Sequence, residues 1–241
     1  MIMKRILYIL PFVLLASVSC KEDTLDVYNG DNYIHFTPSA GDVPQTEFNF
    51  AYDGKTTRET ECKVPVEIRL WGYLPTRDFK CKLSVVKDKT SAASSSFSLP
   101  SETTFRAGHH VDTLWLTVKR NEQLLKTNFT VTVKLEEAED AHIIGPSKYN
   151  TVTVKVTDKI LAEPVWWATK LSEIGKYTDM KYRVFNYYIG KVVMNIDNYT
   201  SITFKEEAVA FRKWWKVEWE KGNHIYYDSD GKTPLYETIP E

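Results

Sequence analysis

Residues 62–70, CKVPVEIRL, alternate strictly between two classes of side chain. The apolar phase holds Cys62, Val64, Val66, Ile68 and Leu70, and the other phase holds Lys63, Pro65, Glu67 and Arg69. Successive side chains of a β-strand point to opposite faces, so this period of two predicts a strand with one buried face. Burial on one side is typical of antiparallel sheets. Pro65 has no backbone N–H, which favours an edge position for this strand.

Six further runs between residues 33 and 157 show the same alternation. They are YIHF at 33–36, then residues 48–52, 79–85, 114–118, 129–135 and 152–156. Links rich in turn-forming residues separate them, and the sequence shows no helical period between them. Seven short strands of this kind predict a mainly β fold, a β-sandwich over residues 33–160.

The periodicity becomes helical after Glu163-Pro164. A short helix is predicted over 164–175, and a second over 179–190 with Thr178 as its cap. A third is predicted from a capping box of Thr203 and Glu206 to Gly222. Its apolar face holds Phe204, Ala208, Phe211, Trp215 and Trp219. Residues 161–241 therefore form a small C-terminal helical segment rich in aromatic side chains.

Composition excludes several classes of protein. The chain has 241 residues, 43% of them hydrophobic and 26% charged, which is typical of a folded globular protein. Its net charge of −1 provides no positive surface for nucleic acid, so no nucleic-acid partner is expected.

The first residues have the layout of a secretory signal peptide. Lys4 and Arg5 precede an apolar run from Ile6 to Val18, and small residues lead to Cys20. This arrangement resembles the lipobox of bacterial lipoproteins, in which the cysteine is acylated and becomes the new N-terminus. The resemblance implies a signal peptide at 1–19, lipidation of Cys20 and an acylated tether at 20–32. An ordinary signal peptide with a chance cysteine is the alternative.

The charged residues Lys21, Glu22 and Asp23 follow directly. They resemble the signal that sends Bacteroidetes lipoproteins to the outer face of the outer membrane. The resemblance implies a lipid-anchored protein that faces the cell exterior. The alternative is a tether that is merely charged.

Several stretches together resemble a known family. AGHHVDTLWLTVKR (107–120), NFTVTVKLEEAED (128–140) and YNTVTVKVTDK (149–159) resemble the closing half of a Calx-beta domain, an immunoglobulin-like sandwich. With YIHF, CKVPVEIRLWG, PVWW and IGKYTDMKY, the mature chain resembles a family of Bacteroidetes lipoproteins known as domain of unknown function 4843. Such proteins accompany SusC/SusD-like nutrient-uptake systems, so the resemblance implies such a transporter as partner.

Metal and cofactor sites are not expected. Calx-beta domains can bind Ca²⁺ through acidic loops, so Asp158 and the one dense acidic cluster, Glu136, Glu137, Glu139 and Asp140, are the candidates. Calcium needs six to eight oxygen ligands, which a single cluster does not supply, so a solvated loop is preferred. Adjacent strand residues point to opposite faces, so His109 and His110 are poorly placed to chelate one metal. No cofactor is predicted.

Cys62 and Cys81 are the two cysteines left after Cys20. An even pair in an exported chain suggests a disulfide, and both residues fall on the apolar phase of their strands. Two buried free thiols are the alternative.

The adjacent tryptophans of the helical segment are the residues most suited to binding. Neighbours on a helix lie about 100° apart around its axis, so one of each pair can face outward. Trp167 and Trp214 are the predicted outward members and candidate contacts for a ligand or partner. The alternative is that the tryptophans fill the core.

These observations predict a non-catalytic outer-membrane surface lipoprotein. It would be an accessory ligand-binding or docking component of a SusC/SusD-like nutrient-uptake system, with a glycan or peptide as ligand. An adhesive or structural surface protein is the alternative, and a glycan- or peptide-degrading enzyme is less favoured because no catalytic motif stands out.

Overall fold

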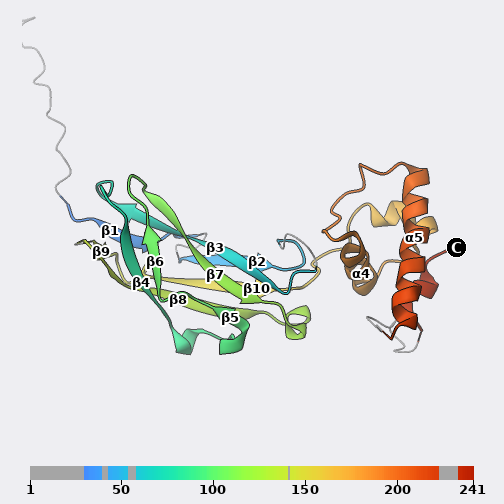
Figure 1. Cartoon of the computed structure of the whole chain (residues 1–241), viewed down its shortest axis with the longest axis horizontal. Helices are drawn as coiled ribbons and strands as arrows, with labels where there is room; N and C mark the ends of the chain where they lie inside the picture. The colour runs from blue at the N-terminus through green and yellow to red at the C-terminus, as the bar shows by residue number, and fades with distance from the viewer. Residues whose placement is uncertain (1–29, 40–42, 54–57, 141, 223–232) are drawn as a thin grey trace, which may run out of the picture. The chain divides into compact units, whose positions relative to one another are not determined.

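The computed structural model describes residues 30–39, 43–53, 58–140, 142–222 and 233–241 (Figure 1). Residues Asn32–Glu241 form one compact unit. This unit contains two hydrophobic cores, one between the sheets of a β-sandwich and one inside the C-terminal helical segment.

The sandwich consists of two five-stranded sheets. The first has the order β5-β7-β3-β1-β9 and the second β2-β10-β8-β4-β6. Their bounds are β1 Tyr33–Phe36, β2 Gln45–Asn49, β3 Glu61–Trp71, β4 Phe79–Val85, β5 Phe97–Ser98, β6 Glu102–Phe105, β7 Val111–Lys119, β8 Phe129–Ala138, β9 Ile143–Ile144 and β10 Thr151–Thr157. The seven predicted strands are all present, although the one predicted over 48–52 lies at Gln45–Asn49 and residues 50–52 form a turn. The fold class is confirmed.

Strands β5, β6 and β9 were not predicted from the sequence. They are two to four residues long. Such short runs show too few alternations to reveal a period of two, and only their pairing partners define them. Short 3₁₀ turns join the strands, namely η1 Lys87–Lys89, η2 Ser94–Ser96 and η3 Glu122–Leu125.

The sheets are mixed, not purely antiparallel. β2 pairs parallel to β10, and β1 pairs parallel to β9, while the other pairs are antiparallel. The chain crosses from the first sheet to the second between β1 and β2, which places β2 beside the last strand of the sandwich.

Pro65 lies in a strand that is central in its sheet, between β7 and β1, so the predicted edge strand is wrong. Nevertheless, β1 is only four residues long and pairs with β3 from Ile68 to Trp71. The N–H of Leu70 bonds toward β7, at the carbonyl of His110, so odd-numbered residues of β3 present their N–H toward the β1 side. Pro65 therefore lies where that side has no β1 residue opposite it, and the missing donor costs no ladder bond to β1.

The C-terminal segment contains η4 Trp167–Lys170, α3 Leu171–Ile174, α4 Asp179–Ile189, α5 Ser201–Glu220 and η5 Leu235–Thr238. Thr178 caps α4 as predicted, and Gly190 ends it in the left-handed conformation. The third helix begins one turn earlier than predicted. Its cap is Thr200, and Thr203 closes the capping box in place of Glu206. A threonine hydroxyl can fill either role, so the residue types alone do not fix the register.

Aromatic side chains fill the second core. Trp166, Trp167, Tyr182, Phe185, Phe204, Phe211 and Trp215 are all buried there. The predicted apolar face of α5 is confirmed, since Phe204, Ala208, Phe211 and Trp215 are its buried residues. Short helices are only marginally stable by themselves, because they have few backbone hydrogen bonds. Burial of these aromatic side chains therefore stabilises the segment.

Gly175, at the end of α3, offers a sharp test of this segment. Its φ is +76° and ψ −175°, a conformation essentially restricted to glycine, and an added Cβ would lie 2.2 Å from the carbonyl oxygen of Thr238. We expect Gly175→Ala to lower the free energy of unfolding by at least about 2–3 kcal/mol, measured by urea unfolding.

Gly222 is the matched control, because its φ is +87° and, among the described residues other than its chain neighbours, no atom lies within 4 Å of an added Cβ. Gly222→Ala should cost only about 1 kcal/mol. Equal losses in the two variants would contradict the close approach of Thr238 to Gly175.

Candidate functional site

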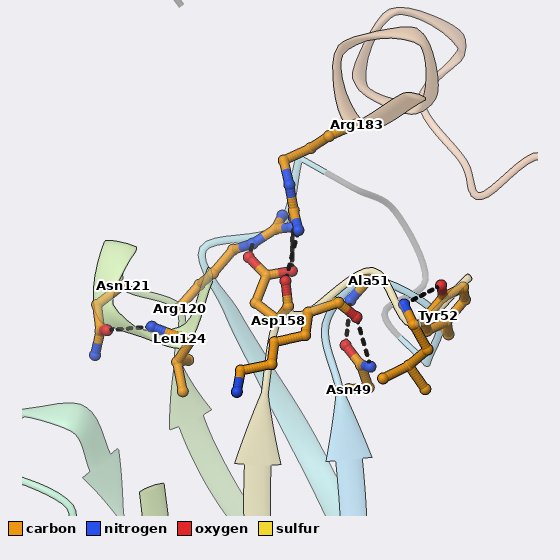
Figure 2. Close-up of polar contacts among 10 residues, drawn as sticks. Asn49, Ala51, Tyr52, Arg120, Asn121, Leu124, Asp158 and Arg183 are labelled. Carbon is orange, nitrogen blue, oxygen red and sulfur yellow. Dashed lines mark hydrogen bonds and ion pairs between the residues drawn. The ribbon is translucent and has the colours of Figure 1, made fainter. Parts of the chain in front are cut away.

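The end of β10 is held by a buried charged cluster. Asp158, the residue after β10, is 2% exposed. The Arg120 guanidinium donates from Nε and Nη2 to its two carboxylate oxygens, at 2.8 and 2.9 Å. Arg183 of α4 donates from Nη1 to Oδ1 at 2.8 Å and from Nη2 to the backbone carbonyl at 2.5 Å. Figure 2 shows the two arginines converging on Asp158 from different elements. We call Arg120, Asp158 and Arg183 the Asp158 cluster.

The cluster connects the sandwich to the helical segment. Arg120 follows β7, Asp158 follows β10, and Arg183 lies in α4. Two guanidinium groups share one carboxylate, so the buried part of the cluster carries a net charge of +1. Bidentate charge-assisted hydrogen bonds of this kind fix orientation as well as contributing energy.

The chain leaving β10 is also held by neutral groups. The Asn49 side chain donates to the carbonyl of Lys159 at 3.0 Å and accepts from the N–H of Ala51 at 2.9 Å. The hydroxyl of Tyr52 accepts from the N–H of Leu161 at 2.8 Å (Figure 2). These bonds satisfy backbone groups of the linker that would otherwise need water.

Arg58 makes a second connection to α4. Its guanidinium donates to the carbonyls of Tyr187 and Tyr188 at 2.8 and 2.9 Å, and lies 5.2 Å from the centre of the Tyr187 ring. These carbonyls belong to the last turn of α4, where a cation also complements the helix dipole.

A cavity of about 350 Å³ opens between these two connections. We call it the junction cavity. Its lining consists of Arg58, Glu59, Thr60, Arg120, Asn121, Glu122, Leu125, Asp158, Arg183, Val184 and Tyr187. Its walls therefore combine apolar side chains with charged groups from both the sandwich and α4.

A separate aromatic group lies on the outer face of the first sheet. Trp71 at the end of β3 is 45% exposed. Its ring centre lies 3.9 Å from that of His35 and 6.1 Å from that of Tyr149, the latter edge-on. We call these three residues the Trp71 cluster. Trp115 on β7 lies on the same outer face and is 50% exposed.

His35 is the buried member of the Trp71 cluster. Burial is the main reason that its pKa is lowered, so the imidazole is neutral at pH 7. Its Nδ1 lies 3.0 Å from the carbonyl of Phe36, which can only accept, so Nδ1 carries the proton. The ring thus supports Trp71 from below as an uncharged platform.

The two tryptophans predicted to face outward differ in burial. Trp167 is fully buried, and its indole N–H donates to the carbonyl of Gly175 at 2.9 Å, so the prediction that it faces outward is wrong. The η4 turn places both Trp166 and Trp167 in the core, where their ring centres are 5.1 Å apart. Trp214 is half-buried against Tyr188 and Phe211.

Cys62 and Cys81 do not form a disulfide with each other, so the predicted bond is wrong; Cys81 is buried and Cys62 is partly buried. Cys62 pairs with Val118 across the first sheet. Cys81 belongs to the second sheet, and the charge of Asp112 contributes to its raised pKa. Asp112 and Val118 are separated by about 20 Å along β7, whereas bonded cysteines have Cα atoms within about 7 Å. Burial, with smaller effects of Glu139 and Asp112, raises the pKa of Cys81 to about 12, so its thiol is unreactive.

The carboxylates of the acidic loop are each engaged by a cation or a backbone group. Cations occupy its carboxylates individually: Lys134 pairs with Glu136, Lys82 with Glu137, and Arg77 with Asp140. Glu139 accepts from the backbone N–H of Lys80 at 2.9 Å. Among the described residues, no group of three or more His, Cys, Asp or Glu side chains is placed to hold a metal ion. His109 and His110 are both exposed.

The N-terminal predictions lie outside the described residues. Cys20, Lys21, Glu22 and Asp23 all fall within residues 1–29. Within the part of the chain that is described, none of the helices combines the length and apolarity needed to cross a bilayer.

A family model described as "Domain of unknown function (DUF4843)" matches residues 28–191. The chain belongs to the DUF4843 family. The matched region contains the sandwich, the Asp158 cluster and α4, and ends just after Gly190. No curated protein matches the chain.

Solved structures similar to this DUF4843 protein include the Calx CBD1 domain, at 12% identity and a TM-score of 0.37, with 54% of this chain and 100% of that domain covered. A protein of unknown function from Bacteroides ovatus is similar at 13% identity and a TM-score of 0.38, over 52% of this chain. A Bacteroides ovatus multidomain protein that includes DUF1735 is similar at 13% identity and a TM-score of 0.37, over 53% of this chain. The chain spans under half the length of the two Bacteroides ovatus proteins, 43% and 45% respectively.

The sequence did not predict the Asp158 cluster or the exposed tryptophans Trp71 and Trp115. Asp158 was considered in the sequence only as a possible calcium ligand, not as the partner of two arginines, and Arg183 stands in an ordinary helical pattern. A signal for Trp71 and Trp115 did exist, because each occupies the polar phase of an alternating strand. A tryptophan in that phase predicts an exposed ring.

Proposed function

We propose that this protein is a non-catalytic, lipid-anchored accessory component at the outer face of the outer membrane. It binds a ligand or docks onto a SusC/SusD-like nutrient-uptake transporter. The observation that supports this proposal is the pair of exposed tryptophans on one outer sheet face, Trp71 and Trp115, 45% and 50% exposed.

Exposed tryptophans are well suited to binding because they supply a large contact area with few rotatable bonds. His35 and Tyr149 hold the Trp71 ring from two sides. A ring held in place loses little entropy on binding, so more of the contact energy appears as affinity. Flat indole faces of this kind suit the sugar rings of a glycan or the side chains of a peptide.

The first test is a tagged pull-down of the full chain from detergent-solubilised outer membrane. We expect a TonB-dependent transporter and its lid lipoprotein to co-purify in stoichiometric amounts. Trp71→Ala and Trp115→Ala should together reduce that recovery at least about tenfold, which corresponds to 1.4 kcal/mol of binding energy. Thermal unfolding should change little because both rings are half exposed.

Val217→Ala is the matched control, since Val217 is 46% exposed on α5, far from the outer sheet face in sequence. It should leave recovery unchanged. Recovery of the protein alone, or equal recovery by all variants, would contradict the proposed docking role and favour an adhesive surface protein.

Surface location can be tested separately. We expect Cys20→Ala to release the protein from the membrane fraction, because loss of the acyl chains removes the anchoring energy of about 0.8 kcal/mol per buried CH₂. Replacing Lys21, Glu22 and Asp23 by Ala should keep the anchor but protect the protein from protease added to intact cells. Unchanged cleavage after the triple substitution would contradict an export role for these residues.

A further inference from the structure

His35 is the buried titratable side chain of the Trp71 cluster. It is 1% exposed, and its Nδ1 donates to the carbonyl of Phe36 at 3.0 Å. The other ring nitrogen, Nε2, is also buried, and it has no hydrogen-bond partner among the described residues. Nε2 is the atom that takes up a proton when this imidazole becomes charged. A proton added there in the packed ring would form a buried N–H group without an acceptor, which is costly.

The charged groups of β3 do not favour a positive charge on His35. Arg69 lies opposite His35 in the strand register, and its repulsion adds to the effect of burial in lowering the pKa of the imidazole. Glu67, on the same face of β3, is held by Arg69 at 2.6 Å and by the hydroxyl of Thr37 at 2.5 Å. On β1 itself, Tyr33 and Thr37 bring only hydroxyl groups to this face. The surrounding strands therefore provide no counter-ion for a charged ring.

The segment that follows β9 covers His35 closely. An added Cβ at Gly145 would lie 3.1 Å from the Cβ of His35, so the two chains are in contact there. The Tyr149 ring centre lies 6.3 Å from that of His35. Lys148 has its Nζ 5.5 Å from the centre of the Tyr149 ring, and residues 143–150 contain no Asp or Glu. This segment therefore brings a further positive charge toward the cluster and no carboxylate.

Trp71 is the member of the cluster with room to move. Its ring packs on His35 with centres 3.9 Å apart, yet the residue is 45% exposed. It ends β3, and Gly72 follows with a φ of +126°. Ile34 and Phe36, the neighbours of His35 in β1, belong to the sandwich core on the other side of the strand. Trp71 and His35 can therefore open outward while the core stays packed.

We propose that His35 is a pH-operated switch for the outer sheet face. At neutral pH the uncharged ring lies under Trp71 and holds the indole in place. Uptake of a proton from solvent at Nε2 in acid drives the imidazolium out to water, and Trp71 swings away because its support is lost. The consequence for binding, release of the ligand or partner in acid, rests on the proposed function, whereas the switch itself is a property of the folded chain alone.

The direction of the pH dependence follows from the lowered pKa. In the open form His35 takes up its proton near its ordinary pKa of 6.5, whereas the packed ring takes it up only at a lower pH. Between these two values the open form binds more protons, so a fall in pH favours opening. Because one group titrates, the ratio of open to closed chain rises by at most tenfold for each unit of pH. Above this window the packed arrangement keeps its full stability.

The experiment labels the full chain with fluorotryptophan, in detergent, and follows the fluorine NMR signals from about pH 8 to about pH 4. Trp71→Phe assigns the signal of Trp71, and Trp115→Phe assigns that of Trp115. We expect the Trp71 signal to shift with the same midpoint as the imidazole signal of His35, below 6.5. Its solvent isotope shift should increase in acid, because the ring becomes more exposed. The Trp115 signal should not follow this midpoint.

His35→Phe is the informative variant, because it keeps a ring under Trp71 that cannot take up a proton. The Trp71 signal should then be independent of pH over the same range. His109→Phe is the matched control, since His109 is an exposed histidine before β7 whose Nδ1 lies 2.7 Å from the carbonyl of Ala107. This variant should show the same shift of the Trp71 signal as the unmodified chain.

Three outcomes overturn the proposal. The first is a Trp71 signal that does not follow the His35 midpoint, and the second is a shift that persists in His35→Phe. The third is a shift without a gain in exposure, because the charged ring would then stay under the indole as a cation–π pair. If His35→Phe fails to fold, the two midpoints in the unmodified chain decide, with Trp115 as internal reference. None of these readings involves the transporter, so a failed pull-down removes the proposed docking role and leaves the switch standing.

Discussion

Replacing Asp158 by Asn is expected to lower the free energy of unfolding by about 3–5 kcal/mol, among the largest effects for any single polar substitution in this chain. The carboxylate is 2% exposed and receives three guanidinium hydrogen bonds from Arg120 and Arg183. The amide keeps the size of the side chain but removes its negative charge and turns an N–H group toward the guanidinium donors. The two guanidinium groups then lose the buried carboxylate that they share.

The measurement is urea unfolding of the full chain, followed by tryptophan fluorescence. A loss of this size should also lower Tm by about 2–4 °C for each kcal/mol, given the length of the chain. Arg183→Gln should cost less than Asp158→Asn, because the two bonds between Arg120 and Asp158 remain.

Asp140→Asn is the matched control for this substitution. Asp140 also pairs with an arginine, Arg77, but the Arg77 side chain is 75% exposed, so solvent screens the pair. The control should change stability by at most about 1 kcal/mol. If Asp158→Asn were no more destabilising than Asp140→Asn, the Asp158 cluster would not hold the linker in place.

Replacing Trp167 by Ala is the second large effect, an expected loss of about 3–5 kcal/mol. The side chain is fully buried and meets Tyr177, Tyr182 and Phe185 edge-on, with ring centres 5.3, 6.0 and 6.4 Å away. Truncation leaves a cavity in a segment that depends on aromatic burial, and it also removes the indole bond to Gly175. Near-UV circular dichroism should show loss of the aromatic signal of the helical segment.

Two comparisons make this result specific to burial. Trp167→Phe retains most of the volume and should cost clearly less than the alanine variant. Trp71→Ala removes a tryptophan that is 45% exposed and should leave stability nearly unchanged while it weakens binding. If Trp167→Ala weakened partner binding without loss of stability, the outward orientation predicted from the sequence would be correct after all.

The strands could be predicted because alternation is a local property. Strands such as β3 and β4 repeat a buried and an exposed side chain along their whole length, and their predicted bounds nearly coincide with the observed ones. The cap of α4 at Thr178 was equally local. β9, two residues long, could not be predicted because it exists only through its pairing with β1.

The candidate sites depended on contacts between distant residues. Arg183 meets Asp158 from 25 positions along the chain, and Arg120 meets it from 38. No spacing rule connects such residues, because the packing of α4 near the end of β10 brings them together. The predicted orientation of Trp167 was also wrong, because a 3₁₀ turn replaces the regular helix that the prediction assumed.

The sequence alone determined the longer strands and helices of this protein, their order, and which face of each long strand is buried, because these follow from the periodicity of neighbouring side chains. Its first residues also led to the prediction of a lipid anchor at Cys20. Only the tertiary structure decided that Cys62 and Cys81 do not pair, that Trp167 is buried, and that Arg120 and Arg183 share the carboxylate of Asp158. These properties arise from contacts between separate elements, and the side chains along a single strand or helix do not encode them.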